Sequence, residues 1–143
     1  LSDVGDFAKD PVGTLAMVGS AEIAALFGLT VEAARRGIMV VFDNAVTGAA
    51  VLAAQAVYPE IKNYIFPSVY YEEPVHQMQM QKMGMKSFLH YDFTEAEGCG
   101  SALGLSLLDA AIDMLNQMKT FGSADVAVAE DGPGKGRQRE DVK

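Results

Sequence analysis

Hydrophobic residues follow two different spacings along this chain. Between residues 21 and 36, apolar side chains recur every three or four positions, which is the spacing of one face of an α-helix. Residues 38–42 are then continuously apolar and rich in β-branched side chains, as in a strand that is covered on both faces. The same alternation of helix and short strand recurs twice more. It predicts an α/β fold in which helices connect parallel strands.

Local signals place the ends of these elements. Ser20 is suited to begin the helix at 21–36 as its N-cap, and Gly37 is suited to end it. Further helices are expected at 45–58, 73–83 and 102–118, and a short helix or turn at 11–18. The expected strands are 38–42, 64–66 and 88–91, with a last extended piece at 126–128.

Composition divides the chain into three regions. Residues 1–9 show no clear period and are interpreted as a lead-in, and residues 10–128 form the α/β region. Residues 129–143 are rich in glycine and charged side chains and almost without apolar ones. We therefore predict that residues 129–143 are a disordered tail.

The charge balance limits the classes of partner. The chain has 11 Lys and Arg residues against 19 Asp and Glu residues, a net charge of −8. Such an acidic balance argues against binding to nucleic acid or to anionic membranes, which require basic surface. One cysteine excludes an internal disulfide framework. Without a long apolar run or a recognisable signal peptide, the expected location is the cytoplasm.

Ligands of open parallel sheets bind beyond the carboxyl ends of the strands, which selects the loops at 43–44, 68–73 and 92–101. In the third loop, Glu97 directly precedes a glycine-rich stretch, Gly98-Cys99-Gly100-Ser101, and a helix follows. A carboxylate at such a turn could act as a general base, and the backbone N–H groups could bind an anion. Alternatively, Glu97 is a helix-start carboxylate that only the helix dipole favours.

Other polar residues give weaker signals. Glu95 and Glu97 could form an acid–base pair, but two acidic residues in a loop are more often simply solvated. His76, on a predicted helix surface, and His90, in a predicted strand, lack the spacing of metal ligands, so no metal site is expected. Cys99 is interpreted as a small packing residue.

Two residue groups remain open to more than one interpretation. Tyr70 and Tyr71 either line a pocket for an aromatic ligand or belong to a surface loop. The clustered methionines are expected to pack in the core or at a subunit interface; they are Met78, Met80, Met83, Met85, Met114 and Met118. In the last expected helix, an apolar stripe contains Leu103, Leu107, Ala110, Met114 and Met118.

Several segments together resemble, in order, those of one enzyme family. They are Val-Gly-Ser-Ala-Glu-Ile-Ala at 18–24, Ala-Ala-Arg-Arg-Gly-Ile-Met-Val-Val-Phe-Asp at 33–43, the Ala-rich 49–59, Tyr-Ile-Phe-Pro-Ser at 64–68, Ala-Glu-Gly-Cys-Gly-Ser-Ala at 96–102 and Asn-Gln-Met-Lys-Thr-Phe at 116–121. The family is the nicotinate-nucleotide–dimethylbenzimidazole phosphoribosyltransferases of cobamide synthesis. The resemblance runs from about residue 10 to residue 128.

This resemblance implies a Rossmann-like parallel sheet with flanking helices in a homodimer, or in a heterodimer with a paralogue. The implied reaction moves phosphoribose from nicotinate mononucleotide to dimethylbenzimidazole or a related aromatic base and releases nicotinate, without a cofactor. Glu97 occupies the position of the family's general base. The residues expected near the substrates are Gly19, Ser20, Asp43, Ser68, Tyr71, Gly98, Gly100 and Ser101.

The sequence also departs from the family pattern. Ser20 and Asn44 stand where glycines are expected, and Tyr71 replaces a serine linked to phosphate binding. Thr94-Glu95-Ala96 replaces an Arg-Leu-Gly lead into the glutamate motif. These changes indicate an altered, for example phenolic, acceptor. They equally suit a non-catalytic or heterodimer-partner subunit, and a third interpretation is that the resemblance concerns packing alone.

The family's chains are more than twice as long as this one. Together with the absence of an initial methionine, this predicts that the sequence is the carboxy-terminal portion of a larger protein. We expect the 143 residues alone to be inactive, because the resemblance places half of the site elsewhere.

Overall fold

A computed structural model describes residues 6–90, 98–120 and 123–124 of the chain. It comprises two compact units, Leu1–Leu107 and Leu108–Lys143, of which the first contains all the described strands. The predicted extended piece at 126–128 and the predicted tail at 129–143 lie outside the described residues.

The helices of the first unit begin and end where local chemistry favours it. They are α1 (Pro11–Val18), α2 (Ala21–Arg35), α3 (Ala45–Val57), the 3₁₀ helix η1 (Pro59–Asn63) and α4 (Pro74–Met83). Ser20 caps α2 by accepting a hydrogen bond from the Ile23 N–H group at 3.4 Å, as predicted. Gly37 and Gly84 follow α2 and α4 with φ angles of 71° and 63°, which glycine adopts without steric cost.

The strands form two parallel pairs. Strand β1 (Val40–Phe42) pairs with β2 (Ile65–Pro67), and β3 (Val69–Tyr70) pairs with β4 (Leu89–His90). Ser68 links the two pairs, because its N–H group donates to the Phe42 carbonyl at 2.9 Å and its own carbonyl accepts from Leu89 at 2.8 Å. The predicted α/β fold with parallel strands is confirmed, but β3 falls within a segment that the sequence predicted as a loop.

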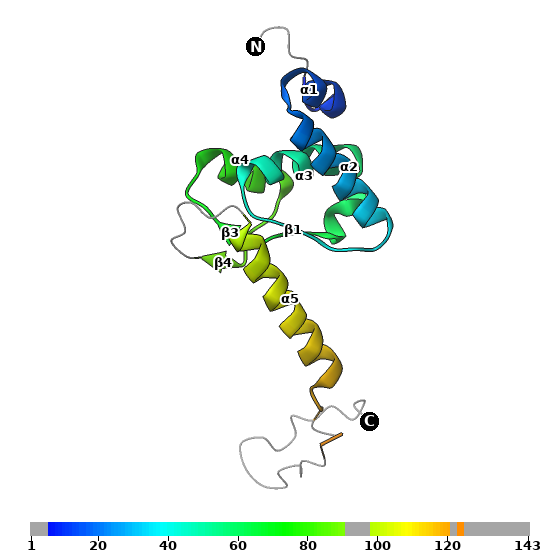
Figure 1. Ribbon diagram of the computed structural model, residues 1–143, viewed down its shortest axis with the longest axis vertical. Helices are drawn as coiled ribbons and strands as arrows, with labels where there is room; N and C mark the ends of the chain where they lie inside the picture. Colours follow the sequence, from blue (N-terminus) through cyan, green and yellow to red (C-terminus); the bar gives the residue numbers. More distant parts are fainter. Residues whose placement is uncertain (1–5, 91–97, 121–122, 125–143) are drawn as a thin grey trace, which may run out of the picture. The chain divides into compact units, whose positions relative to one another are not determined.

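The core lies between the strands and a layer of helices. Figure 1 shows α3 between α2 and α4, and α3 packs on both of them. Four apolar side chains on α3 are almost fully buried: Ala50, Val51, Ala53 and Ala54. Around this small-residue helix the core contains Phe42, Ile65, Met80 and Met83. The core role predicted for Met80 and Met83 is thus confirmed, whereas Met78 is 69% exposed.

Helix α5 (Cys99–Gln117) differs from its prediction in two ways. It begins at Cys99, so residues 99–101 are its first turn and not part of a loop, as the sequence suggested. Its buried residues are Gly100 and Gly104, whereas Leu103 and Leu107 from the predicted apolar stripe are 44% and 48% exposed. In the second unit, Met114 and Met118 are also exposed. Within the described residues, no helix combines the length and apolar character needed to cross a membrane.

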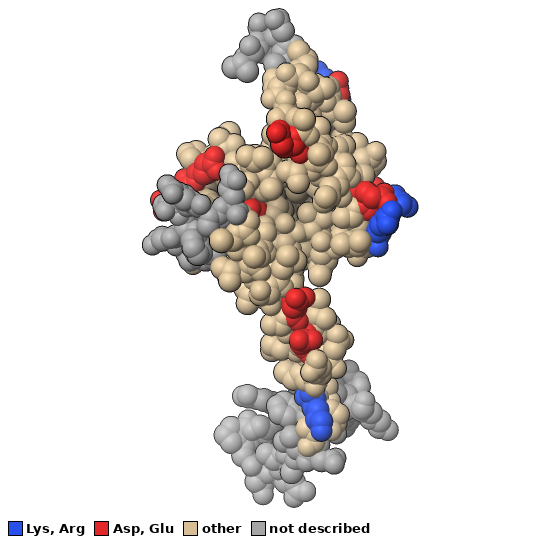
Figure 2. Space-filling model, in the orientation of Figure 1, with Lys and Arg blue, Asp and Glu red and all other residues tan. Residues whose placement is uncertain are grey.

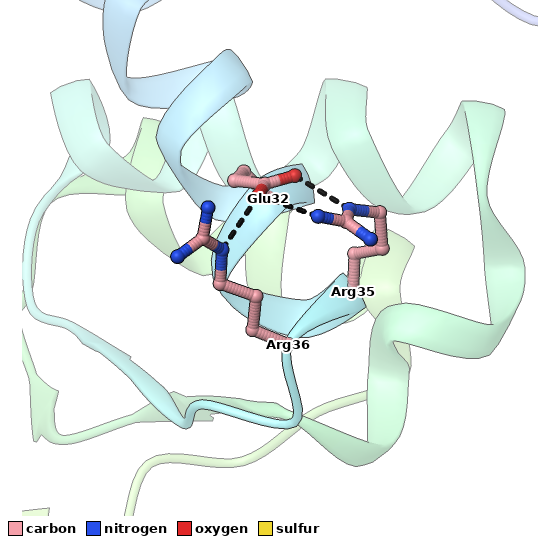
Figure 3. A network of polar contacts seen from close by, with 3 residues as sticks. All are labelled: Glu32, Arg35 and Arg36. Atoms are coloured by element: carbon pink, nitrogen blue, oxygen red, sulfur yellow. Dashed lines mark hydrogen bonds and ion pairs between the residues drawn. The ribbon is translucent and has the colours of Figure 1, made fainter.

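Three charged side chains at the carboxyl end of α2 form a hydrogen-bonded network (Figure 3). Glu32 accepts hydrogen bonds from Arg35 at 2.7 and 2.8 Å and from Arg36 at 2.6 Å. The hydrogen bonds from Arg35 and then Arg36 lower the pKa of Glu32 to about 2. Its side chain is 46% exposed and those of the arginines are more so, so water and salt screen the attraction.

Charged side chains are scattered over the face of the molecule shown in Figure 2, with wide uncharged areas between them. Exposed large apolar residues occur on several helices, among them Val12, Met17, Leu29 and Val46. The described surface therefore presents no extended basic patch on this face, in agreement with the acidic balance of the chain.

Candidate functional site

Asp43 lies at the carboxyl end of β1 and is only 1% exposed. Its Oδ2 atom accepts a hydrogen bond at 3.0 Å from the backbone N–H group of Ser101, 58 residues further along the chain. A carboxylate at the amino-terminal end of a helix also interacts favourably with the helix dipole. The structure thus brings together two residues that the sequence analysis assigned to the site.

The first turn of α5 is attached to the strands by further contacts. Gly98 precedes the helix with a φ angle of 83°, and its carbonyl accepts from Ala102 at 2.9 Å, so Gly98 is the N-cap residue. The Ser101 hydroxyl donates to the carbonyl of Val41 in β1 at 3.4 Å. Because Asp43 already engages the Ser101 N–H group, this N–H is not available to a bound phosphate.

Glycines allow α5 to approach the strands closely. A Cβ atom at Gly100 would lie 2.6 Å from Val69 Cγ2 and 2.9 Å from Asp43 Cβ. At Gly104 it would lie 2.7 Å from Ser68 Cβ and 3.0 Å from Val41 Cγ1. Both positions are therefore reserved for glycine. Gly104 was not predicted as a site residue, although its spacing of four residues from Gly100 places both on one helix face.

Ser68 is fully buried where the two strand pairs meet. Its hydroxyl donates to the carbonyl of Phe42 at 3.1 Å, so in this structure the side chain holds the strand ends together. Asp43, Ser68, Gly100 and Ser101 consequently form one cluster, which we call the strand-edge cluster. It is located where the topology of a parallel sheet places ligand sites.

Two departures from the family pattern have local structural explanations. Asn44 caps α3 through a capping box with Thr47, and its φ of −140° does not require glycine. Ser20 caps α2, and its hydrogen bond lowers the pKa of Glu22. A side chain at Gly19 would collide with the Leu15 carbonyl. The contacts of Gly19 and Ser20 described here thus belong to the junction of α1 and α2.

Tyr71 lies beside a buried histidine. The Tyr71 ring meets the His76 ring edge-on, with centroids 6.1 Å apart, and the Phe42 ring also meets it edge-on, with centroids 6.5 Å apart. His76 is 1% exposed, so its prediction as a helix-surface residue was wrong. Neither of its ring nitrogens has a hydrogen-bond partner in the described part of the chain.

The other residues singled out in the sequence have different surroundings. Tyr70 is 39% exposed and stacks on His90 with a centroid distance of 5.0 Å. Cys99 is exposed, so its prediction as a packing residue was wrong. Glu97, Glu95 and Thr94 lie outside the described residues. Among the residues that are described, no group of three or more His, Cys, Asp or Glu side chains could hold a metal ion.

Comparison with known proteins places these residues in a wider context. A family model described as phosphoribosyltransferase matches residues 2–126. The nicotinate-nucleotide–dimethylbenzimidazole phosphoribosyltransferase of Nitratidesulfovibrio vulgaris (strain DP4) is 40% identical over 124 residues, 87% of this chain and 35% of the relative. The protein of the same name from Desulforamulus reducens is 36% identical over 120 residues, 84% of this chain and 34% of the relative.

A solved structure gives the same correspondence. The crystal structure of CobT from Thermus thermophilus superposes with a TM-score of 0.75 and 32% sequence identity, covering 82% of this chain and 35% of that one. The chain therefore spans about a third of the length of the relatives that it matches.

Proposed function

The chain belongs to the nicotinate-nucleotide–dimethylbenzimidazole phosphoribosyltransferase family, and from this premise we propose that it contributes to phosphoribosyl transfer in cobamide synthesis. The donor is nicotinate mononucleotide and the acceptor an aromatic lower-ligand base. The observation that carries the proposal is the strand-edge cluster. There the glycine-rich motif that follows Glu97 is attached to the carboxyl ends of the strands through the Asp43–Ser101 hydrogen bond.

Glu97 is proposed as the general base. For a benzimidazole acceptor, one ring nitrogen attacks C1′ of the ribose as the bond from C1′ to the nicotinate nitrogen breaks. Nicotinate leaves with the electron pair of that bond, and the Glu97 carboxylate takes the proton from the other ring nitrogen of the acceptor. A base positioned within hydrogen-bond reach of this proton contributes roughly 10²- to 10⁴-fold to such a reaction.

Tyr71 supports an acceptor that differs from dimethylbenzimidazole. Its ring packs against the buried His76, so a bulky aromatic side chain stands where the resemblance expects a serine. Phenols are acceptors of a different shape and are included in the proposal for this reason. The complete protein would then act as a homodimer, or as the partner subunit of a heterodimer with a paralogue.

Nicotinate release tests the proposed function. The protein encoded by the complete reading frame is incubated with nicotinate mononucleotide and a panel of benzimidazoles and phenols, alone and with any paralogous partner. We expect nicotinate and a nucleotide product in equal amounts with at least one acceptor. Release with none of them would contradict the enzymatic proposal and favour a non-catalytic subunit.

The 143-residue chain by itself provides a matched control. We propose that it is inactive, because it spans only 35% of its Nitratidesulfovibrio vulgaris relative and the remaining part would have to complete the site. Turnover by the isolated chain would contradict this part of the proposal.

A further inference from the structure

The first turn of α5 receives its capping interaction from a distant residue. Where an N-cap residue is Ser, Thr, Asp or Asn, its side chain accepts a hydrogen bond from a backbone N–H group two or three positions later. Here the N-cap residue is Gly98, which has no side chain. The acceptor for the N–H of Ser101, three positions later, is the carboxylate of Asp43.

Asp43 is well placed for such a role because its own position is fixed. It directly follows Phe42, which is paired with Pro67 in the parallel β1–β2 ladder. Its N–H group lies 3.4 Å from the Thr47 hydroxyl in the first turn of α3, and its side chain is shielded from solvent. On the other side, Gly100 approaches its Cβ so closely that no side chain fits between them.

The residue before Gly98 in the chain is Glu97. Glu97 lies outside the described residues, and the described part of the motif begins at Gly98, the next residue in the sequence. Displacing a catalytic group by about 1 Å can lower a rate by roughly 100-fold. The anchoring of this turn is therefore of direct consequence for a base at residue 97.

We propose that Asp43 is a positioning residue for the transfer reaction: its carboxylate caps α5 and thereby fixes the turn that directly follows the proposed base, Glu97, in the sequence. This inference rests on the proposed function. It differs from the substrate contact that the resemblance implies for Asp43, since the Oδ2 atom is engaged by protein backbone. The interaction needs a side-chain oxygen at residue 43 but not a negative charge.

Amide hydrogen exchange tests the capping role independently of activity. The exchange rate of the Ser101 amide proton is measured by NMR in the wild-type chain, in Asp43→Asn and in Asp43→Ala. We expect Asp43→Asn to stay near the wild-type rate, because its amide oxygen still accepts. Asp43→Ala should exchange at least about fivefold faster, the loss typical of a helix cap. Equal exchange in wild type and Asp43→Ala would overturn the proposal.

Steady-state kinetics of the complete protein test the positioning role. We expect Asp43→Ala to lower kcat roughly 10- to 100-fold while KM for nicotinate mononucleotide stays within about twofold, and Asp43→Asn to restore most of kcat. A rise in KM that is equal in both variants would overturn the proposal in favour of a substrate contact. If the wild-type protein transfers nothing, the proposed function fails, and the exchange experiment alone then decides whether Asp43 caps α5.

Discussion

Two groups of polar contacts in the first unit differ in how much they say about function. At the end of α2, Glu32 forms short hydrogen bonds with Arg35 and Arg36, all within one helical turn and largely exposed. In the strand-edge cluster, Asp43, Ser68 and Ser101 come from separate parts of the sequence. Their hydrogen bonds are longer than those of Glu32, and Asp43 and Ser68 are buried. The exposed network shifts a pKa strongly, whereas the buried cluster determines where a helix begins.

The two groups differ because one is exposed to solvent and the other is largely buried. Water competes for each exposed charge, so even an ideal ion pair on a surface contributes little to the free energy of unfolding. A buried polar atom that loses its partner has no water to replace it, so its hydrogen bond is expensive to remove. We therefore expect substitutions in the strand-edge cluster to have larger effects than those in the network at the end of α2.

The largest effect on stability is expected for Gly100→Ala. The new Cβ atom would overlap Val69 and Asp43, and overpacking of this kind costs about 1–3 kcal/mol. The matched control is Gly28→Ala in α2, where the added Cβ would meet nothing within 4 Å beyond its chain neighbours and the backbone of its own helix. That variant should gain about 0.5–1 kcal/mol from better helix propensity. Urea unfolding of both variants checks this difference in sign, and equal changes would contradict the close packing of α5.

A smaller effect is expected for Ser68→Ala. It removes the hydrogen bond from the buried hydroxyl to the Phe42 carbonyl, but that carbonyl keeps the backbone N–H of Ser68 as a donor. The loss should therefore be about 1 kcal/mol. Ser106→Ala, which removes an exposed hydroxyl that donates to the Ala102 carbonyl, serves as the control and should be close to neutral. A neutral Ser68→Ala variant would show that the hydroxyl does not stabilise the strand ends.

The smallest effect is expected for Glu32→Gln. The pKa of Glu32 is lowered from 4.5 to about 2 in the folded chain, so its charge stabilises the fold above pH 4.5 and this contribution is lost as the pH falls towards 2. Thermal melting should place the wild type slightly above the variant at neutral pH. The difference should shrink at low pH and in about 0.5 M salt, where surface charges are screened. A large, salt-independent difference would contradict the comparison of the two regions.

Much of the fold could be predicted because its signals are local. Helix α2 begins directly after its N-cap Ser20 and ends before Gly37 through local signals that depend only on neighbouring residues. Strand β1 was recognisable from its continuous apolar run, and both features also carry part of the family resemblance. By contrast, β3 has only two residues, and the Tyr71-Glu72-Glu73-Pro74 that follows gives its surroundings the composition of a loop.

The missed features depend on contacts between distant residues. The buried face of α5 is formed by Gly100 and Gly104, whereas hydrophobicity pointed to Leu103 and Leu107. A hydrophobicity pattern does not reveal that a helix approaches a sheet closely, because the residue that allows the approach is glycine, which has no side chain. His76 was likewise predicted on a helix surface, yet it is 1% exposed and its ring contacts those of Phe42 and Tyr71, from other segments of the chain.

The role of Glu97 is the central claim, and nicotinate release by the complete protein tests it most directly. Initial rates are compared for the wild type, Glu97→Gln and the matched control Glu95→Gln, two residues earlier in the chain. Removal of a general base predicts a fall in kcat of roughly 10²- to 10⁴-fold for Glu97→Gln and a much smaller change for Glu95→Gln. Undiminished nicotinate release by Glu97→Gln, or an equal loss in both variants, would contradict the assignment of Glu97 as the single base.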